Sequence, residues 1–228
     1  VSDILFVYHD NYKQKALREG ISENRIHVVG NTIVEPLLKL ADLNVINSKK
    51  HILLDIHRPE NFKYTDRMKK ILDYANFCVQ KFQIPVEMLS FHTTIKAIES
   101  YHLQLRDINL IPLMGYKDFI KYQQECKFII SDSGTAQEEP ALLNIPVIVP
   151  RDYTERPESM ENDCSFMLKV EAQDHQTTSI EWLRSIHYMK KGWLGAGNTS
   201  KEILIILKVL PALSQLFIRF LNTNLFSF

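Results

Sequence analysis

Hydrophobic and polar positions along the chain follow two different periods in turn. Short apolar runs typical of β-strands occur at Ile4–Tyr8, Ile26–Val29, His51–Ile56, Val86–Phe91, Leu110–Leu113, Phe128–Ile130 and Pro146–Val149. Segments with apolar residues at helical spacing separate these runs, at Asn11–Glu19, Val34–Leu40, Thr65–Phe82, Ile95–Tyr101, Tyr116–Glu125 and Gln137–Leu143. This alternation predicts βαβ units and a parallel sheet, so we expect an α/β fold.

The pattern is weaker after Arg151. It predicts, in order, a polar loop at Gln173–Thr178, a helix at Ile180–Tyr188, a glycine-containing turn at Trp193–Thr199 and a last helix through Leu210. Thr199 or Ser200 is suited to cap that last helix.

The C-terminal stretch Pro211–Phe228 is apolar and aromatic, and no role follows from its sequence. Lys208, Pro211 and Arg219 interrupt the apolar segment Ile203–Phe220, which makes it a poor match to a membrane span of ~20 residues. A helix buried in the fold or facing a partner fits better, and a tail without a packing role is the remaining alternative. We therefore expect no membrane association.

The charge balance argues against a general attraction to polyanions. Lys+Arg and Asp+Glu number 27 each, so no net field favours nucleic acid or an anionic membrane. A small anionic ligand is still compatible with this balance, because it needs only a local site. The length of 228 residues and the hydrophobic fraction of 45% allow a sizeable core.

The cysteines do not form a disulfide or zinc pattern. Cys78, Cys126 and Cys164 are odd in number and widely spaced, and the chain has no intact GxGxxG, GxxxxGK[ST] or HExxH motif. We expect free thiols, no metal, no cofactor and a cytoplasmic location. The chain begins at Val1 without a secretion signal, which suggests a fragment or a trimmed chain.

The strongest chemical signal is the segment Phe128–Glu139, FIISDSGTAQEE. A buried strand leads into a turn of small residues that is expected to open a helix. The unpaired N–H groups of a first helical turn bind phosphate, Ser133 adds a hydroxyl, and Gly134 permits a close approach of the ligand to the backbone. The alternative is that Ser133 or Asp132 only caps the helix.

Acidic residues follow this turn. A carboxylate at Glu138 or Glu139 suits the two neighbouring hydroxyls of a ribose, because it accepts both hydrogen bonds. The alternative is one solvated carboxylate and one that supports the helix dipole.

A polar cluster follows the apolar run His51–Ile56. It contains His57, Arg58, Glu60 and Asn61, at the end of a strand where ligands of parallel sheets collect. A histidine with an arginine and a carboxylate nearby is suited to acid–base work on a phosphorylated substrate near neutral pH. A purely structural histidine is the alternative.

Three further residues are candidates. His92 also follows a strand, Arg156 is suited to pair with phosphate, and an exposed Phe119 ring is suited to stack on a base. The corresponding alternatives are a capping histidine, an arginine held by Glu155 or Glu158, and a core aromatic.

Three ordered motifs resemble the bacterial non-hydrolysing UDP-N-acetylglucosamine 2-epimerases. They are HRPENF at His57–Phe62, SDSGTAQEE at Ser131–Glu139 and RDYTERPE at Arg151–Glu158, and VVGNT at Val28–Thr32 matches the entry to that family's C-terminal domain. The resemblance extends from about Ile4 to Met167 and more faintly to Ser200. It implies a Rossmann-like parallel sheet, the C-terminal half of a two-domain GT-B-type fold, with the N-terminal domain largely missing.

The resemblance also implies a domain division and a reaction. Residues 1–28 are expected to be a remnant of the N-terminal domain, 29–210 the UDP-binding domain and 211–228 a tail. In the family the C2 proton is removed and UDP is expelled to give a 2-acetamidoglucal, and UDP then adds back with the proton on the other face. The sugar-side carboxylates come from the N-terminal half, so we expect a UDP-binding fragment that is inactive alone. The full-length enzyme is expected to be a homodimer. The alternative is that a separate chain supplies the missing N-terminal half.

By similarity, His57 is a catalytic residue near the diphosphate. The expected substrate-binding residues are Arg58, Glu60, Asn61, His92, Phe119 (uracil), Ser133, Gly134 and Thr135 (phosphate), Glu139 (ribose) and Arg156 (nucleotide region).

The sequence departs from the family pattern at several positions. Thr135 stands where many members have a second glycine, and Ile56 precedes His57 where a small residue is common. Threonine at the position of Thr135 also occurs in relatives that act on other UDP-2-acetamido sugars, so the resemblance leaves the identity of the sugar open. There are two alternatives to an epimerase. One is a catalytically silent remnant that binds a nucleotide sugar, and the other is half of a GT-B glycosyltransferase. The three motifs argue against the glycosyltransferase.

Overall fold

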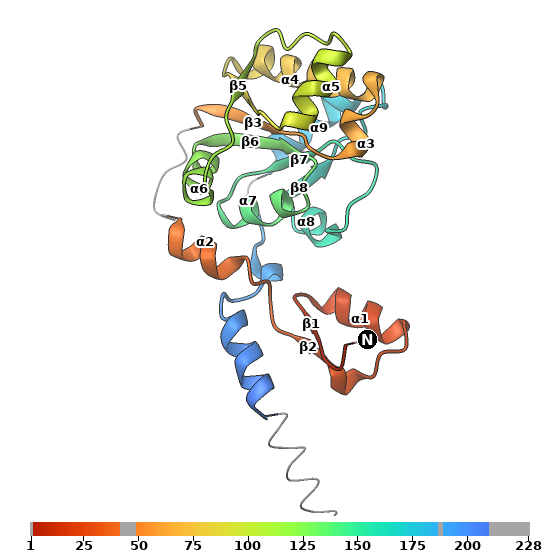
Figure 1. The fold of residues 1–228 in the computed structure, drawn as a ribbon, viewed down its shortest axis with the longest axis vertical. Helices are drawn as coiled ribbons and strands as arrows, with labels where there is room; N and C mark the ends of the chain where they lie inside the picture. Colours follow the sequence, from red (N-terminus) through yellow and green to blue (C-terminus); the bar gives the residue numbers. More distant parts are fainter. Residues whose placement is uncertain (1, 42–48, 187–188, 210–228) are drawn as a thin grey trace, which may run out of the picture. The chain divides into compact units, whose positions relative to one another are not determined.

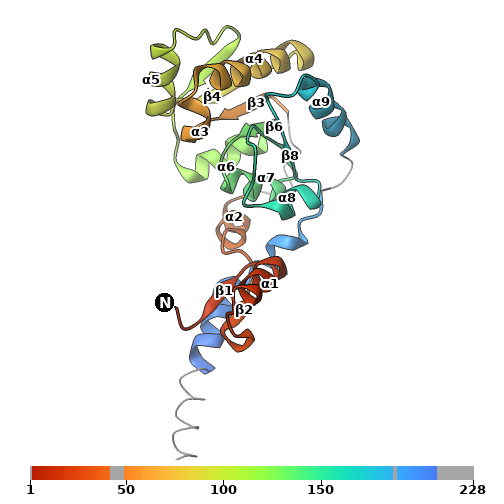
Figure 2. The same cartoon turned by 90° about the vertical axis from the view of Figure 1, so that its right-hand side faces the viewer.

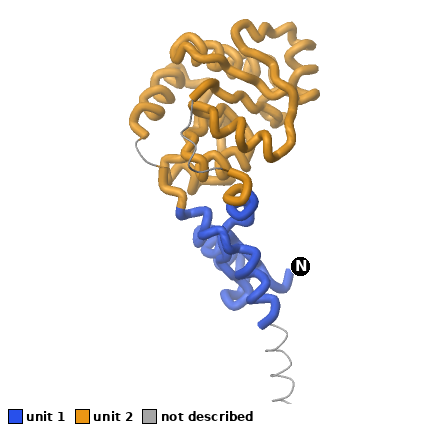
Figure 3. Tube along the Cα trace, turned by 90° about the vertical axis from the view of Figure 1, so that its left-hand side faces the viewer, with its two compact units in different colours: residues 1–36, 192–228 blue, residues 37–191 orange. Residues whose placement is uncertain are grey.

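The computed structural model describes residues 2–41, 49–186 and 189–209. The chain divides into two compact units, coloured separately in Figure 3. We call Leu37–Lys191 the sheet unit, and Val1–Pro36 with Gly192–Phe228 the terminal unit. Helix α2 (Val34–Leu40) contains the division between them.

The sheet unit contains six parallel strands in the order β5-β4-β3-β6-β7-β8 (Figure 1). Their bounds are β3 (His51–Asp55), β4 (Val86–Leu89), β5 (Ile108–Ile111), β6 (Cys126–Ser131), β7 (Val147–Val149) and β8 (Ser165–Met167). The chain runs outward from β3 to β5 and then returns to β6 on the other side of β3. The carboxyl ends of β3 and β6 therefore flank the switch point of the sheet, where ligands of such folds bind.

Helices cover both faces of this sheet (Figure 2). Their bounds are α3 (Pro59–Phe62), α4 (Thr65–Phe82), α5 (His92–Ser100), α6 (Tyr116–Gln124), the 3-10 turn η2 (Thr135–Gln137), α7 (Glu139–Leu142), α8 (Pro157–Glu161) and α9 (His175–Ser185). Helices α4, α5 and α9 supply side chains to one continuous core cluster with β3, β4 and β6. On α4 the residues that the helical spacing predicts to face the core, among them Met68, Ile71 and Ala75, are buried.

The terminal unit contains two short parallel strands, β1 (Leu5–Val7) and β2 (Ile26–Val28). They are joined by α1 (Asp10–Arg18) and the 3-10 turn η1 (Glu23–Arg25), and the unit also holds the 3-10 turn η3 (Gly192–Leu194) and helical residues 199–209. The backbones of Gly30 and Gly195 cross closely, with positive φ angles of 82° and 95°. A Cβ on Gly195 would lie 2.8 Å from the Cα of Gly30, so the crossing requires glycine.

The predicted α/β class and every strand predicted from an apolar run are present. The predicted loop at Gln173–Thr178 is wrong from His175 onward, because α9 begins there. The predicted helix at Gln137–Leu143 is instead a 3-10 turn followed by α7. The sequence pattern missed α3, α8 and β8. The domain limits 1–28, 29–210 and 211–228 stay a prediction.

Within the described residues, no helix is both long enough and apolar enough to cross a membrane. The tail Pro211–Phe228 lies outside the described residues.

Candidate functional site

The turn after β6 presents a group of free backbone donors. The Ser133 N–H donates to the Ser131 hydroxyl at 3.0 Å, and the first hydrogen bond inside the turn runs from the Gln137 N–H to the Gly134 carbonyl. Within the described part of the chain, the N–H groups of residues 134–136 have no acceptor. Three adjacent unpaired donors at the end of a parallel strand can hold an anion.

The capping alternative for this turn does not hold. Gly134 is the N-cap residue of η2, and no side chain caps that turn. The expected helix Gln137–Leu143 behind the turn is also wrong as one element, since η2 and α7 comprise three and four residues. The helix dipole therefore contributes little, and the N–H donors are the main feature available to an anion.

A pocket of about 280 Å³ lies beside this turn. It is lined by residues of β3, β6, the turn, α6 and α7: Asp55, Ile129, Ser133, Thr135, Ala136, Tyr116, Phe119, Gln123 and Glu139. Four residues singled out from the sequence, Phe119, Ser133, Thr135 and Glu139, thus meet in one pocket. Tyr116 and Gln123 were missed, and the spacing of both residues from Phe119 on one helix was the available signal.

Glu139 is a buried carboxylate on the pocket wall. Only 5% of the residue is exposed, and Oε1 accepts a 2.8 Å hydrogen bond from the Tyr116 hydroxyl. Burial raises the pKa of Glu139 above its ordinary value, while hydrogen bonds from Tyr116 and Gln123 act in the opposite direction. The carboxylate is thus placed to accept hydrogen bonds from a ligand in the pocket.

His57 is held by a carboxylate directly after β3. Its Nδ1 lies 2.8 Å from Oδ1 of Asp55, and its ring packs against Phe91 with centroids 4.9 Å apart. The hydrogen bond to Asp55 raises the pKa of His57, and burial opposes that effect. The protonated form of the ring is therefore favoured more than in an unperturbed histidine.

Asp132 fixes the segment that carries His57. This fully buried carboxylate accepts from the N–H of His57 at 3.1 Å, the N–H of Arg58 at 3.0 Å and Nδ2 of Asn61 at 2.9 Å. Asn61 is itself buried, and its amide oxygen accepts from Arg67. Asp132 and Asn61 therefore join the carboxyl ends of β3 and β6.

Asp55, His57 and Asp132 place one ligand atom each within 4.8 Å of one another, as in a metal site. Each carboxylate, however, already accepts hydrogen bonds: Asp55 from His57 and from the Ser131 hydroxyl at 2.8 Å, and Asp132 from the donors named above. These hydrogen bonds account for the cluster without a cation.

A second polar network lies after β7. The fully buried Arg151 binds Glu60 and Glu155 at 2.7 Å each, and Glu155 also lies 3.7 Å from Arg58. The hydrogen bond with Arg151 lowers the pKa of Glu155 to about 2. Arg151 was missed as an organising residue, although it follows a strand and precedes acidic residues.

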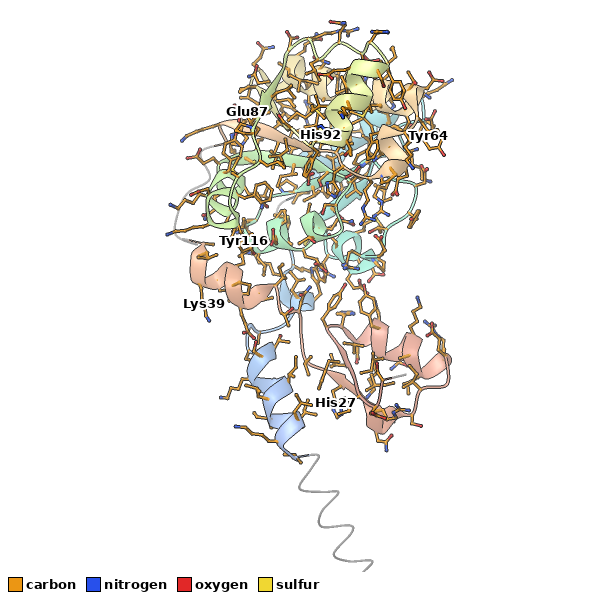
Figure 4. The ribbon with its side chains drawn as sticks, viewed as in Figure 1. His27, Lys39, Tyr64, Glu87, His92 and Tyr116 are labelled. Carbon is orange, nitrogen blue, oxygen red and sulfur yellow. The ribbon has the colours of Figure 1, made fainter. Side chains whose placement is uncertain are left out.

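Arg156 has a partner that the sequence did not suggest. Its Nε donates to Oε1 of Glu138 at 2.5 Å, and its Nη1 donates to the main-chain carbonyl of Glu155 at 3.2 Å. His92 is exposed and lies on the first turn of α5, where Figure 4 labels it. The structure does not bring His92 into the lining of the pocket.

Comparison with known proteins agrees with this geometry. A family model described as UDP-N-acetylglucosamine 2-epimerase matches residues 1–208. The UDP-N-acetylglucosamine 2-epimerases of Methanocaldococcus jannaschii and Methanococcus maripaludis are 30% and 29% identical over 227 residues. These matches cover 91% and 90% of this chain. The chain spans about 61% of the length of each relative.

Solved structures show the same fold. The M. jannaschii UDP-GlcNAc 2-epimerase in complex with UDP-GlcNAc and UDP has a TM-score of 0.80 at 28% identity, and covers 91% of this chain and 61% of its own. S. aureus MnaA with UDP has a TM-score of 0.78 at 26% identity, with 93% and 60% covered. These neighbours confirm the predicted GT-B-type α/β class. The chain therefore belongs to the UDP-N-acetylglucosamine 2-epimerase family.

Proposed function

We propose that the sheet unit is the UDP-binding part of an isomerase that interconverts UDP-GlcNAc and UDP-ManNAc. One observation carries this proposal: an aromatic ring, a buried carboxylate and a turn of free N–H donors share one pocket of about 280 Å³. These are the groups needed for a base, a ribose and a diphosphate. Relatives of this chain have been solved with UDP-GlcNAc and UDP.

Each part of the nucleotide has a matching group. Phe119 stacks on the uracil, and Glu139 accepts hydrogen bonds from the ribose hydroxyls. The N–H groups of residues 134–136 and the Ser133 hydroxyl bind the diphosphate. Gly134 permits this approach because it has no side chain.

The remaining candidates act around this site. Arg58 and Arg156 supply positive charge toward the phosphates. Glu60 and Asn61 have a supporting role, because Glu60 binds Arg151 and Asn61 binds Asp132. His92 is assigned to the sugar side of the site, outside the pocket lining.

The expulsion of UDP determines what these groups do in the reaction. Negative charge grows on the diphosphate as its bond to the sugar breaks, and the N–H donors together with protonated His57 stabilise that charge. Removal and return of the C2 proton require carboxylates on the sugar side. We assign these carboxylates to the part of the relatives that this chain does not cover, supplied within a longer protein or by a separate chain.

Compartment and assembly are also proposals. The buried free thiols of Cys78, Cys126 and Cys164 are in keeping with a reducing cytoplasm. A homodimer is proposed for the complete enzyme by resemblance.

Calorimetric titration of the purified chain with UDP tests the nucleotide site. We expect saturable binding, weakened by roughly 1–3 kcal/mol in Glu139→Ala because the ribose hydroxyls lose their acceptor. The matched control is Glu161→Ala at an exposed glutamate of α8 outside the pocket, which should bind like the original chain. Absence of binding by the folded chain would reject the site. The activity of the chain should then be measured after addition of the complementary N-terminal part. Turnover that appears only with this part would support the isomerase and argue against a catalytically silent remnant.

A further inference from the structure

Asp55 connects the anion-binding turn to His57. It is the last residue of β3, only 6% exposed, and it pairs in register with Ser131 of β6. Its Oδ2 accepts from the Ser131 hydroxyl at 2.8 Å, and that hydroxyl accepts from the Ser133 N–H at 3.0 Å. Its Oδ1 lies 2.8 Å from Nδ1 of His57. A continuous chain of hydrogen bonds thus runs from the turn to the imidazole.

We propose that Asp55 is a positioning residue that holds His57 through Nδ1, leaves Nε2 as the atom that faces the substrate, and couples this orientation to the diphosphate-binding turn. The identity of the substrate in this inference rests on the proposed function. The hydrogen-bond chain itself is a property of the ligand-free protein.

The carboxylate decides which nitrogen of His57 keeps its proton. An ionised carboxylate only accepts hydrogen bonds, so Nδ1 donates to Asp55 whether the ring is neutral or cationic. Within the described residues Nε2 has no hydrogen-bond partner. Nε2 is therefore an acceptor when the ring is neutral, and a donor to a departing diphosphate oxygen when the ring is cationic.

Among the residues that the structure describes, no other group near His57 can replace Asp55. Asp132 lies 3.7 Å from Nδ1, beyond hydrogen-bonding distance, and its oxygens already accept from two main-chain N–H groups and Asn61. The positive charge of the adjacent residue Arg58 has the opposite effect on the pKa of His57, because it disfavours a second cation. The Phe91 ring packs against the imidazole and carries no charge.

Nitrogen-15 NMR of the histidine side chains in the full chain tests the inference, with His57→Gln used to assign the signal. In the original chain we expect the Nδ1–H tautomer above the titration midpoint. Asp55→Ala should convert the neutral ring to the Nε2–H tautomer that free histidine favours. Asp55→Asn keeps the shape and removes the charge, so its midpoint should fall by about 1 pH unit.

A separate measurement tests whether the orientation of His57 is coupled to the diphosphate-binding turn. UDP should shift the His57 ring signals in the original chain, and Ser131→Ala should reduce that shift while UDP still binds. Thermal unfolding of each variant establishes that it is folded. If Asp55→Ala does not fold, the titration midpoint of Asp55→Asn decides the question.

The inference and the proposed function fail in different ways. An unchanged tautomer in Asp55→Ala, or an unchanged midpoint in Asp55→Asn, would overturn the role of Asp55 even in a chain that binds UDP. A chain that does not bind UDP would contradict the proposed function, while the tautomer in the ligand-free chain would still decide the role of Asp55.

Discussion

The hydroxyl of Tyr116 donates a 2.8 Å hydrogen bond to Oε1 of Glu139, and both residues line the same pocket. Tyr116 lies at the start of α6, where Figure 4 labels it, and it is 40% exposed, whereas the carboxylate is buried. The ionised carboxylate is therefore stabilised from the rim of the pocket. If the ribose binds Glu139 as proposed, one of its hydroxyls must share the carboxylate with this phenol or replace it.

We expect Glu139→Gln to stabilise the ligand-free chain at pH 7 while it weakens UDP binding. Burial raises the folded-state pKa of Glu139, so the folded chain binds this proton more tightly than the unfolded chain. Stability therefore falls as the pH rises through that raised pKa, and the ionised group is destabilising at pH 7. The gain in unfolding temperature should disappear near pH 4, where the carboxyl is protonated. A variant less stable than the original chain at pH 7 would show that Glu139 is structural.

Replacement of the Phe119 ring should weaken nucleotide binding. Stacking of a base on an aromatic side chain is worth about 1–3 kcal/mol, so Phe119→Ala should lower UDP affinity by that amount and leave Phe119→Tyr close to the original value. Calorimetry with UDP measures the effect. Tyr64→Ala removes an aromatic that is 64% exposed and outside the pocket lining, and it serves as the control. Equal affinity in Phe119→Ala would place the uracil elsewhere.

The sheet was predictable because its strands are short apolar runs bounded by polar turns. All five residues of β3 are buried, and α4 has the predicted bounds Thr65–Phe82. The missed elements lack such signals. Helix α8 has five residues and begins with Pro157, and β8 has three residues at the sheet edge beside β7. Neither is long enough to show a period.

The first turn of α9 was missed for a different reason. Its sequence is polar, and its stability depends on partners distant in the chain. The His175 ring that begins the helix lies 5.9 Å from the Tyr74 ring of α4, and the Tyr74 hydroxyl donates to the buried Ser179 of the next turn at 2.9 Å. Such a tertiary contact overrides the local preference for a loop.

The residue types of the site were predictable from the sequence, but the hydrogen-bond partners of these residues were less so. Asp132 was considered as a helix cap, which is its best local role, yet its carboxylate binds the segment after β3. Asp55 lies inside an apolar run, and the sequence pattern did not predict a role for it. Both roles depend on the adjacency of β3 and β6, strands separated by two others along the chain. Local sequence patterns carry no signal for that adjacency.

Two histidines of the sheet unit should have opposite effects on the pH dependence of stability. His57 has a raised pKa, so its stabilising contribution is complete below about pH 6.5 and is lost as the pH rises through the folded-state pKa. His51 has a pKa lowered by burial, so its neutral form is favoured and the fold loses stability as the pH falls below about 6.5.

Chemical unfolding of His57→Gln and His51→Gln between pH 5 and pH 9 measures these contributions. The difference in unfolding free energy from the original chain should shrink with rising pH for His57→Gln and with falling pH for His51→Gln. Parallel curves for the original chain and either variant would contradict the corresponding pKa direction.

The crossing of Gly30 and Gly195 should make the terminal unit sensitive to a single methyl group. A Cβ on Gly195 meets the Gly30 backbone at 2.8 Å, and its φ of 95° is one that other residues rarely adopt. We expect Gly195→Ala to lower the free energy of unfolding by about 1–3 kcal/mol. It should also speed hydrogen exchange of the Asn31 N–H, which donates to the Leu194 carbonyl at 2.8 Å. Gly192→Ala is the matched control, because no atom lies within 4 Å of its new Cβ. If the Asn31 N–H exchanges at the same rate in both variants, the close crossing of Gly30 and Gly195 does not stabilise the terminal unit.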